Sequence, residues 1–302
     1  MSTPSLPGRS ALGWIKLLRP TQWVKNFFIL PAPLFGLAHS AGSLQLWLDV
    51  LGAFVAFCLV SSGVYVFNDI LDAAADRLHP VKRSRLIASG RIRPAVAGAL
   101  SAGLFAVGIA LAAFGRRELA GIVLIYVLNS VAYALYFKHK VIADVLSISL
   151  GFMLRILGGA AAVGVEPSSW LMTCGFSLAL FLGFCKRRSE IEIYESHQDA
   201  AGVRAVFASY TKEKLNLLVG IVAAMTIVTY LLFTTSPETR ELHGTKSLVY
   251  TSPFVIYCVL RFLMKTLELR GEDAAETLLK DKGFLAAGFG WVASVAWILY
   301  FS

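Results

Sequence analysis

Long apolar runs alternate with short, strongly basic segments along the whole chain. Most of these runs are close to the ~20 residues that an α-helix needs to cross a bilayer. The pattern predicts nine transmembrane helices. They cover 23–38, 46–67, 94–114, 119–137, 141–163, 169–185, 215–234, 248–263 and 284–301. The first run is short and contains Pro31 and Pro33, so it departs most from a regular helix.

Composition places the protein in the membrane class. Of 302 residues, 57% are hydrophobic and 16% are charged, whereas globular proteins carry roughly 25% charged residues. The polar segments are too short to separate soluble domains, so residues 1–302 are expected to form one membrane-embedded, all-α unit. The four cysteines are scattered singly through apolar runs, which argues against a disulfide framework or a zinc site.

The basic residues gather in alternate segments, and the net charge is +9. The positive-inside rule therefore predicts a cytoplasmic N-terminus in the inner (plasma) membrane. The basic excess needs no nucleic-acid partner to explain it. Three longer segments, 68–93, 186–214 and 265–282, carry charge at helical spacing. We expect them to be partly helical caps on the cytoplasmic side.

An acidic-basic motif follows the second apolar run, in FNDILDAAADRLHPVKRSR. Its acidic part consists of Asn68, Asp69, Asp72 and Asp76, and its basic part of Lys82, Arg83 and Arg85. The three aspartates have spacing i, i+3 and i+7, which puts them on one helical face. Such oxygen ligands suit Mg²⁺, which also takes substrate phosphates. The basic part is suited to the phosphate oxygens that the metal leaves free. The alternative is an acidic helix end with a solvated basic loop.

Further polar residues lie at or inside predicted membrane boundaries. They are Lys25, Asn26, Tyr136, Lys138, Lys140, Asp144, Arg155, Lys186, Arg187 and Glu190. Ionisable residues inside a span usually face a cavity or a partner, so Asp144 and Arg155 are binding candidates. A purely structural Asp–Arg network is the alternative. Lys186 and Arg187 are candidates for a phosphate-binding clamp. The alternative is that they only mark the cytoplasmic end of the span, as the positive-inside rule expects, and form i,i+4 salt bridges with Glu190. For Lys25 the alternative is a snorkelling lysine.

The chain resembles the UbiA superfamily of intramembrane prenyltransferases in RPTQWVKN, NDILDAAADRLHPVKRSRLIASG and DVLSISLGFMLRILGGAA. The resemblance covers most of the chain and implies nine helices around a central cavity. Ordinary members bind a prenyl diphosphate through Mg²⁺ and two aspartate-rich motifs. The first motif is matched, but KRRSEIEIYE stands where the second is expected. This departure resembles the decaprenyl-phosphate phosphoribosyltransferase branch. That branch transfers phosphoribosyl from phosphoribosyl diphosphate to a polyprenyl phosphate and so supplies a precursor of cell-wall arabinose.

The resemblance implies roles for the polar residues. Asp69, Asp72 and Asp76 would hold Mg²⁺ on the donor diphosphate. Lys82, Arg83 and Lys140 would offset charge on the leaving group. Lys186 and Arg187 would seat the ribose 5-phosphate, and Lys25 would orient the acceptor phosphate. The apolar cavity between the helices would hold the lipid tail.

Two rival functions remain at this stage. One is a conventional UbiA-type prenyltransferase with an aromatic acceptor, and the missing second aspartate motif counts against it. The other is a transporter of a phosphorylated solute, which predicts charges near mid-membrane and inverted repeats. All three functions place the protein in the lipid bilayer. The sequence does not determine the oligomeric state, and a homo-oligomer is one of the alternatives.

Overall fold

The computed structural model describes residues 11–36, 43–78, 82–196, 210–268 and 280–300, and this part of the chain contains helices but no strand. Eight of its helices are long and apolar enough to cross a membrane. They are α3 (Leu44–Leu71), α5 (Pro94–Gly115), α6 (Arg117–Leu135), α7 (Ala143–Val163), α8 (Ser169–Ser196), α9 (Lys212–Thr235), α11 (Ser252–Glu268) and α13 (Lys282–Tyr300). The predicted all-α membrane fold is therefore confirmed.

The first predicted span is a broken segment rather than a regular helix. It follows α1 (Ala11–Leu18) and consists of a 3₁₀ helix, η1 (Pro20–Ile29), and a short helix, α2 (Pro31–Gly36). Both pieces pack on α7, and η1 also packs on α3. A Cβ added to Gly159 would lie 1.9 Å from the Ile29 carbonyl oxygen, so glycine permits this close approach. The count of nine regular spans is thus not confirmed in the described residues.

Five short helices complete the described structure. They are α4 (Ala73–Leu78), η2 (Lys82–Ser84), η3 (Phe137–His139), α10 (Pro237–His243) and η5 (Ser247–Thr251). The predicted partly helical cap at 68–93 contains α4 and η2, although 79–81 lie outside the described residues. The other two predicted caps are described only in part, because 197–209 and 269–279 also lie outside.

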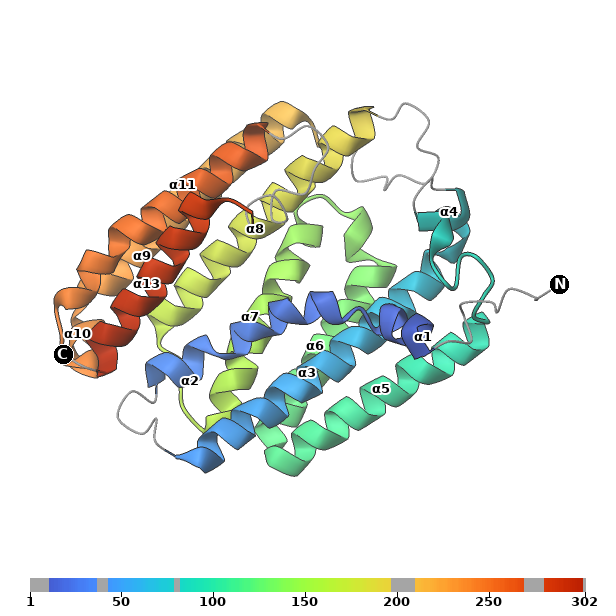
Figure 1. Cartoon of the computed structure of the whole chain (residues 1–302), viewed down its shortest axis with the longest axis horizontal. Helices are drawn as coiled ribbons and strands as arrows, with labels where there is room; N and C mark the ends of the chain where they lie inside the picture. Colours follow the sequence, from blue (N-terminus) through green and yellow to red (C-terminus); the bar gives the residue numbers. More distant parts are fainter. Residues whose placement is uncertain (1–10, 37–42, 79–81, 197–209, 269–279, 301–302) are drawn as a thin grey trace.

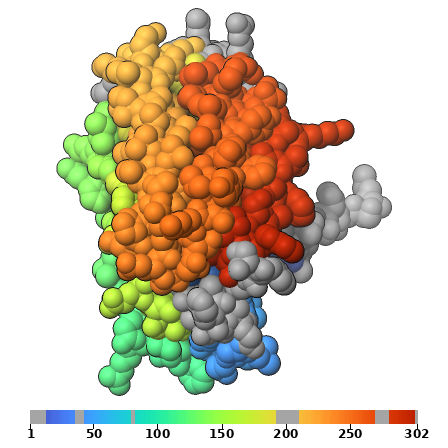
Figure 2. Space-filling model, turned by 90° about the vertical axis from the view of Figure 1, so that its left-hand side faces the viewer, coloured from blue at the N-terminus to red at the C-terminus, as the bar shows by residue number. Residues whose placement is uncertain are grey.

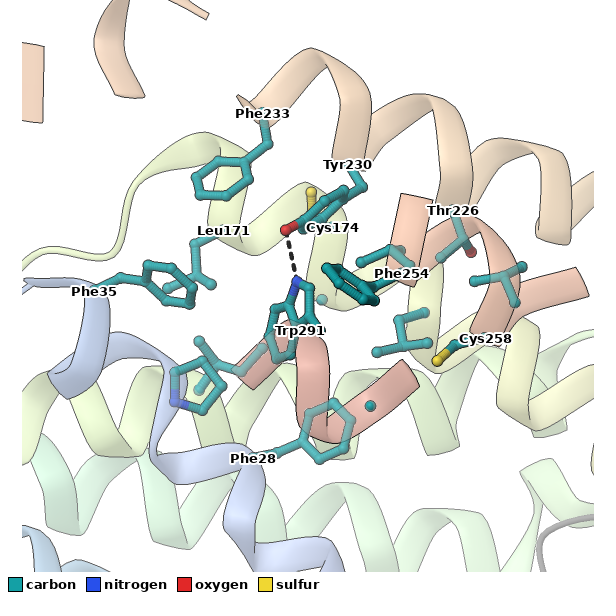
Figure 3. Close-up of a pocket in the computed structure, with 17 residues that line it drawn as sticks. Phe28, Phe35, Leu171, Cys174, Thr226, Tyr230, Phe233, Phe254, Cys258 and Trp291 are labelled. Carbon is teal, nitrogen blue, oxygen red and sulfur yellow. Dashed lines mark hydrogen bonds between the residues drawn. The ribbon is translucent and has the colours of Figure 1, made fainter. Parts of the chain in front are cut away.

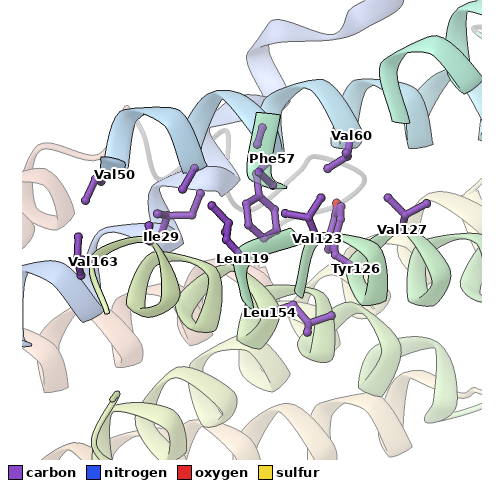
Figure 4. Close-up of a cluster of buried hydrophobic side chains, with 14 of the residues drawn as sticks. Ile29, Val50, Phe57, Val60, Leu119, Val123, Tyr126, Val127, Leu154 and Val163 are labelled. Atoms are coloured by element: carbon purple, nitrogen blue, oxygen red, sulfur yellow. The ribbon is translucent and has the colours of Figure 1, made fainter. Parts of the chain in front are cut away.

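The long helices form two groups that meet at α7 and α8 (Figure 1). In the first group α3, α5, α6 and α7 pack around Phe57, Val123 and Tyr126 (Figure 4). In the second, α8 and α9 pack around Phe181 and Leu215, with α11 and α13 alongside. The N-terminal segment η1–α2 runs across α7 towards the second group. This arrangement brings the polar ends of α3, α7 and α8 into one region.

The outer faces of the bundle are apolar. Phe114 is 92% exposed, Phe289 75% and Trp297 64%. Figure 2 shows the face built by α9, α11 and α13, and only 6% of the apolar window of α13 is buried. Exposed apolar surface of this extent needs a bilayer around it.

The orientation predicted from charge can be tested with two single cysteines. Helices α4 and α10 lie at opposite ends of the bundle (Figure 1). Ser84 belongs to η2, which packs on α4, and Thr245 follows α10. In a cysteine-free background we expect an impermeant thiol reagent added outside intact cells to label Thr245→Cys but not Ser84→Cys. Permeabilised cells, in which both should react, provide the control. Labelling of Ser84→Cys from outside would reverse the topology.

Candidate functional site

Two buried carboxylates lie where α3 gives way to α4. Asp69 is 5% exposed and Asp76 is 4% exposed. Arg19 Nη2 donates to Asp69 Oδ1 at 2.5 Å. Arg85 Nη1 donates to Asp76 Oδ2 at 2.7 Å and to Asp69 Oδ1 at 3.2 Å. The arginines neutralise carboxylates whose burial alone would be costly.

Asp72 departs from the predicted three-carboxylate face. It forms the turn between α3 and α4, and its Oδ1 accepts from Lys138 Nζ at 2.7 Å. Among the described residues no group of three His, Cys, Asp or Glu side chains could hold a metal. The structure does not place the three carboxylates on one helical face, because the break after Leu71 lets Asp72 pair with Lys138 of η3, so the prediction of one site with three carboxylates stays a prediction. The Lys138 ammonium group, predicted to bind substrate, is therefore engaged in the ion pair with Asp72.

The remaining two carboxylates still fit a divalent cation. Arg85 Nη1 contacts both Asp69 and Asp76, so their oxygens can reach one positive centre. Mg²⁺ is usually held by one or two carboxylates together with water and substrate phosphates. Asn68 lies one turn before Asp72 in the same region and is half-buried. The donor set therefore suits Mg²⁺ bound together with an anionic substrate.

Arg19 is a site residue that the sequence reasoning missed. Its φ is 51° and it precedes Pro20, a combination that is unfavourable because residues before proline prefer extended backbone. Its guanidinium also lies 5.2 Å from the ring centre of Tyr65. Tyr65 is one turn before Asp69 on α3, so both partners of Arg19 lie on one face of that helix, but no sequence spacing links them to Arg19.

A second cationic group lies towards the C-terminal end of α8. Lys186 is exposed and lies within electrostatic range of Lys25, Tyr133 and Glu190. Lys25 Nζ donates to Gln22 Oε1 at 2.7 Å and to Tyr65 Oη at 3.5 Å. Tyr65 therefore links this group to Arg19 and the carboxylates. The structure thus brings together Lys25 and Lys186, which are far apart in the sequence.

The other predicted phosphate-binding residues line the accessible edge of the same region. Lys82 and Arg83 are exposed on η2. Lys140 is exposed after η3, with its Nζ 5.2 Å from the ring centre of Tyr136. Tyr136 is 56% exposed. An anionic substrate can approach all four side chains.

Asn26 and Arg155 are buried supports. Asn26 is fully buried and Arg155 is 5% exposed. Arg155 Nε donates to Asn26 Oδ1 at 2.7 Å, its Nη2 donates to Tyr126 Oη at 2.8 Å, and its Nη1 donates to the Gly151 carbonyl at 2.8 Å. These bonds fasten η1 to α7 directly beside Lys25. Direct substrate binding by Asn26 or Arg155 does not fit their burial.

Asp144 and Arg187 form a second buried support. Both side chains have no exposed surface, and Arg187 Nε lies 3.3 Å from Asp144 Oδ2. Arg187 also pairs with Glu190, one turn further along α8. The alternative of a structural role for Asp144 and Arg155 fits their burial, with Arg187 of α8 as a partner of Asp144 and Asn26 of η1 as a partner of Arg155. Arg187 cannot contact a substrate in this structure, which leaves Lys186 as the accessible half of the predicted clamp.

Tyr210, just before α9, anchors this support and was also missed. Its hydroxyl accepts from the Ile142 amide at 2.7 Å and donates to Asp144 Oδ1 at 3.1 Å. Ile142 has a φ of 68°, which is rare for a β-branched residue. Tyr210 therefore holds the strained turn that joins Lys140 to α7. A tyrosine in a polar segment between two apolar runs gave no distinguishing sequence signal.

Alkaline unfolding tests the role of Tyr210. Burial raises the pKa of Tyr210 to about 12, against about 10 in an unfolded chain. Because the folded pKa is the higher one, this stabilisation is complete below pH 10 and is lost as pH rises through 12. Relative to Tyr210→Phe, the wild type should lose up to about 2–3 kcal/mol of unfolding free energy over that range. Thermal unfolding in detergent at several pH values measures this loss of stability. The same dependence of stability on pH in wild type and Tyr210→Phe would contradict the role of Tyr210.

An apolar cavity of about 280 Å³ lies between the N-terminal segment and the second helix group. Its walls come from η1, α2, α7, α8, α9, α11 and α13, and include Phe28, Phe35, Leu171 and Phe254 (Figure 3). Trp291 Nε1 donates to Tyr230 Oη at 2.7 Å within it. A hydrocarbon chain would fit such walls, and only 6% of the apolar window of α13 is buried.

Comparisons with known proteins agree with this architecture. A "Decaprenyl-phosphate phosphoribosyltransferase" from Corynebacterium glutamicum is 33% identical over 97% of this chain and 89% of its own length. A protein of the same name from Mycolicibacterium smegmatis is 30% identical over 99% and 96%. A solved UbiA homolog from Archaeoglobus fulgidus, bound to GPP and Mg²⁺, has a TM-score of 0.69 at 21% identity. The match covers 93% of this chain and 99% of that one. That structure supports the fold alone.

The model of the UbiA prenyltransferase family matches residues 29–288. The matched stretch runs from the end of η1 into α13 and contains both carboxylates, Lys186 and most of the cavity lining. The chain belongs to the UbiA prenyltransferase family.

Proposed function

We propose that this protein is an enzyme that transfers 5-phosphoribosyl from phosphoribosyl diphosphate to a polyprenyl phosphate. The observation that carries the proposal is that the exposed Lys186 lies within electrostatic range of Lys25, so that the site offers a cationic group in addition to the Asp69–Asp76 pair. A donor with a diphosphate and a 5-phosphate needs two anion sites, and cations suit the second. The names of the curated relatives support the same reaction.

The proposed mechanism assigns each group a task. Asp69 and Asp76 would hold Mg²⁺, which would supply Lewis-acid stabilisation of the diphosphate leaving group. Lys82, Arg83 and Lys140 offset charge on that group as the bond to the anomeric carbon breaks. Lys186 seats the 5-phosphate.

Lys25 orients the acceptor phosphate, whose oxygen forms the new bond from the face opposite the departing diphosphate. The apolar cavity accepts the first part of the lipid tail (Figure 3). We place the site on the cytoplasmic side of the plasma membrane, where the soluble donor is made.

A reconstitution assay tests the proposal. Purified protein, Mg²⁺, radiolabelled phosphoribosyl diphosphate and polyprenyl phosphate should yield a labelled lipid, and omission of Mg²⁺ should abolish it. The rival prenyl transfer is tested in parallel with a labelled prenyl diphosphate and an aromatic acceptor. Transport of the donor is tested in sealed vesicles without lipid phosphate. Labelled product in either rival assay, without phosphoribosyl lipid, would refute the proposal.

A further inference from the structure

A second cavity lies beside the beginning of α3, whereas Asp69 lies near the end of that helix. Its volume is about 230 Å³. Its lining comes from the beginning of α3, the end of α5, the start of α6 and the end of α7. Helices α3 and α5 lie side by side (Figure 1). The proposed transfer reaction uses neither this cavity nor its lining residues, so the cavity needs a separate explanation.

The cavity is closed at its floor and open at its rim. Ala53 and Ala162 line it and are buried, whereas Leu48 and Phe114 line it and are exposed. A Cβ added to Gly52 would meet no atom within 4 Å, so α3 leaves open space at this position. Exposed apolar side chains of a membrane-spanning bundle face hydrocarbon. The cavity therefore opens towards lipid.

Two opposite charges line this cavity without pairing. Asp49 is half-buried and Arg116 is exposed. Asp49 Oδ1 accepts from Gln45 Nε2 at 2.9 Å, but the ion pairs among the described residues include neither Asp49 nor Arg116. A charge beside hydrocarbon is costly unless it is paired. Both side chains would therefore gain from a charged partner inside the cavity.

The end of α7 positions the Arg116 guanidinium. Arg116 ends α5 and directly precedes α6. A Cβ added to Gly164, the residue that ends α7 with a φ of 71°, would lie 2.6 Å from Arg116 Nη1. Glycine thus lets the guanidinium rest on the last turn of α7, where the helix dipole favours a cation. A planar guanidinium at this place is suited to bind a phosphate group.

We propose that this cavity binds the head group of a phospholipid that carries both a phosphate and a primary ammonium group. Arg116 donates to the phosphate, and Asp49 accepts from the ammonium group while it keeps its bond to Gln45. The acyl chains leave the cavity past Leu48 and Phe114. The bound lipid connects α3 to the junction of α5 and α6, at the end of α3 that the proposed reaction does not use.

The pattern of charges selects among membrane lipids. Phosphatidylethanolamine supplies a partner to both Arg116 and Asp49. Phosphatidylglycerol supplies a phosphate for Arg116 but leaves Asp49 without a cation. Phosphatidylcholine carries a positive charge, but its quaternary nitrogen has no hydrogen to donate to Asp49. The site should therefore prefer phosphatidylethanolamine to the other two lipids.

The test titrates each lipid into purified full-length protein in detergent. Native mass spectrometry measures how much lipid stays bound, and thermal unfolding measures the stabilisation. We expect one phosphatidylethanolamine per chain, bound about tenfold more tightly than phosphatidylglycerol or phosphatidylcholine, because one charge-assisted contact distinguishes them. Glycerophosphoethanolamine, which has the head group but no acyl chains, should not stabilise the protein at the same concentration. Equal binding of this soluble compound and the lipid would overturn the assignment to a lipid.

Charge variants with matched controls locate the site. Arg116→Gln should weaken phosphatidylethanolamine binding about tenfold. Arg117→Gln should not, since Arg117 carries the same charge and is exposed but does not line the cavity. Asp49→Asn should abolish the preference for phosphatidylethanolamine over phosphatidylglycerol. Glu118→Gln should keep it, because Glu118 is exposed in the first turn of α6 and does not line the cavity.

A third variant fills the cavity and keeps both charges. Gly52→Leu places a side chain in the open space beside α3, so it should exclude the lipid without lowering the stability of the lipid-free protein. Gly103→Leu is its control, since Gly103 also has open space around it but lies elsewhere on α5. Equal phosphatidylethanolamine affinity in Gly52→Leu and Gly103→Leu, or in Arg116→Gln and Arg117→Gln, would overturn the inference. An unchanged lipid preference in Asp49→Asn would do the same.

Discussion

Replacing Asp69 or Asp76 with Asn should lower turnover roughly 10²-fold or more, because each change removes a carboxylate from a pair that can share one cation. Asp72→Asn should have a smaller effect, since Asp72 pairs with Lys138 rather than with Arg85. The measurement is the initial rate of labelled-lipid formation at saturating donor and acceptor. The Mg²⁺ concentration at half-maximal rate should also rise for Asp69→Asn and Asp76→Asn.

Glu118→Gln is the matched control, because Glu118 is exposed in the first turn of α6, which begins beside the other end of α3. Each variant must first be shown to be folded by its thermal unfolding, since Asp69 belongs to a buried ion pair. Wild-type rates in both Asp69→Asn and Asp76→Asn would remove these carboxylates from the mechanism. Equal losses in Glu118→Gln would show that the effect is not local.

Replacing the neighbouring Lys186 and Arg187 with Ala should produce different defects. Lys186→Ala should raise KM for phosphoribosyl diphosphate about tenfold and leave KM for the lipid acceptor unchanged, because an accessible charge-assisted contact is lost. Arg187→Ala should instead lower the free energy of unfolding by about 3–5 kcal/mol. It leaves Asp144, which has no exposed surface, without its arginine.

Steady-state kinetics with each substrate varied in turn and thermal unfolding in detergent distinguish the two defects. Lys246→Ala is the control for loss of a lysine, since Lys246 is exposed after α10. Equal changes in both KM values for Lys186→Ala would argue against a site for the 5-phosphate. Unchanged stability in Arg187→Ala would contradict its assignment as a buried support.

The sequence alone was enough to determine the membrane class and eight of the long helices. Backbone groups in hydrocarbon must bond within their own segment, so an apolar run of sufficient length becomes a helix whatever its neighbours are. The spans predicted at 94–114 and 141–163 illustrate this, since the limits of α5 and α7 lie within two residues of the predicted ones. The prediction of a regular helix failed for the first apolar run, because its prolines interrupt the helix and because its conformation depends on contacts with α7.

The polar residues of the site were also found by the sequence, because charge next to an apolar run is a local signal. Their partners were not. Arg19 and Asp69 are fifty positions apart, and Asp72 meets Lys138 across a break in the helix that no spacing rule foresees.

Only the tertiary structure decided which charges a substrate can reach. Lys186 and Arg187 are adjacent in the sequence, yet a helix turns about 100° between neighbours, so one is exposed and the other lies wholly inside. Asp144 and Arg155 share a helix but pair with α8 and with η1. Helix formation follows from the local sequence. Exposure and pairing depend on how separate helices pack, and they therefore appear only when the whole bundle is assembled.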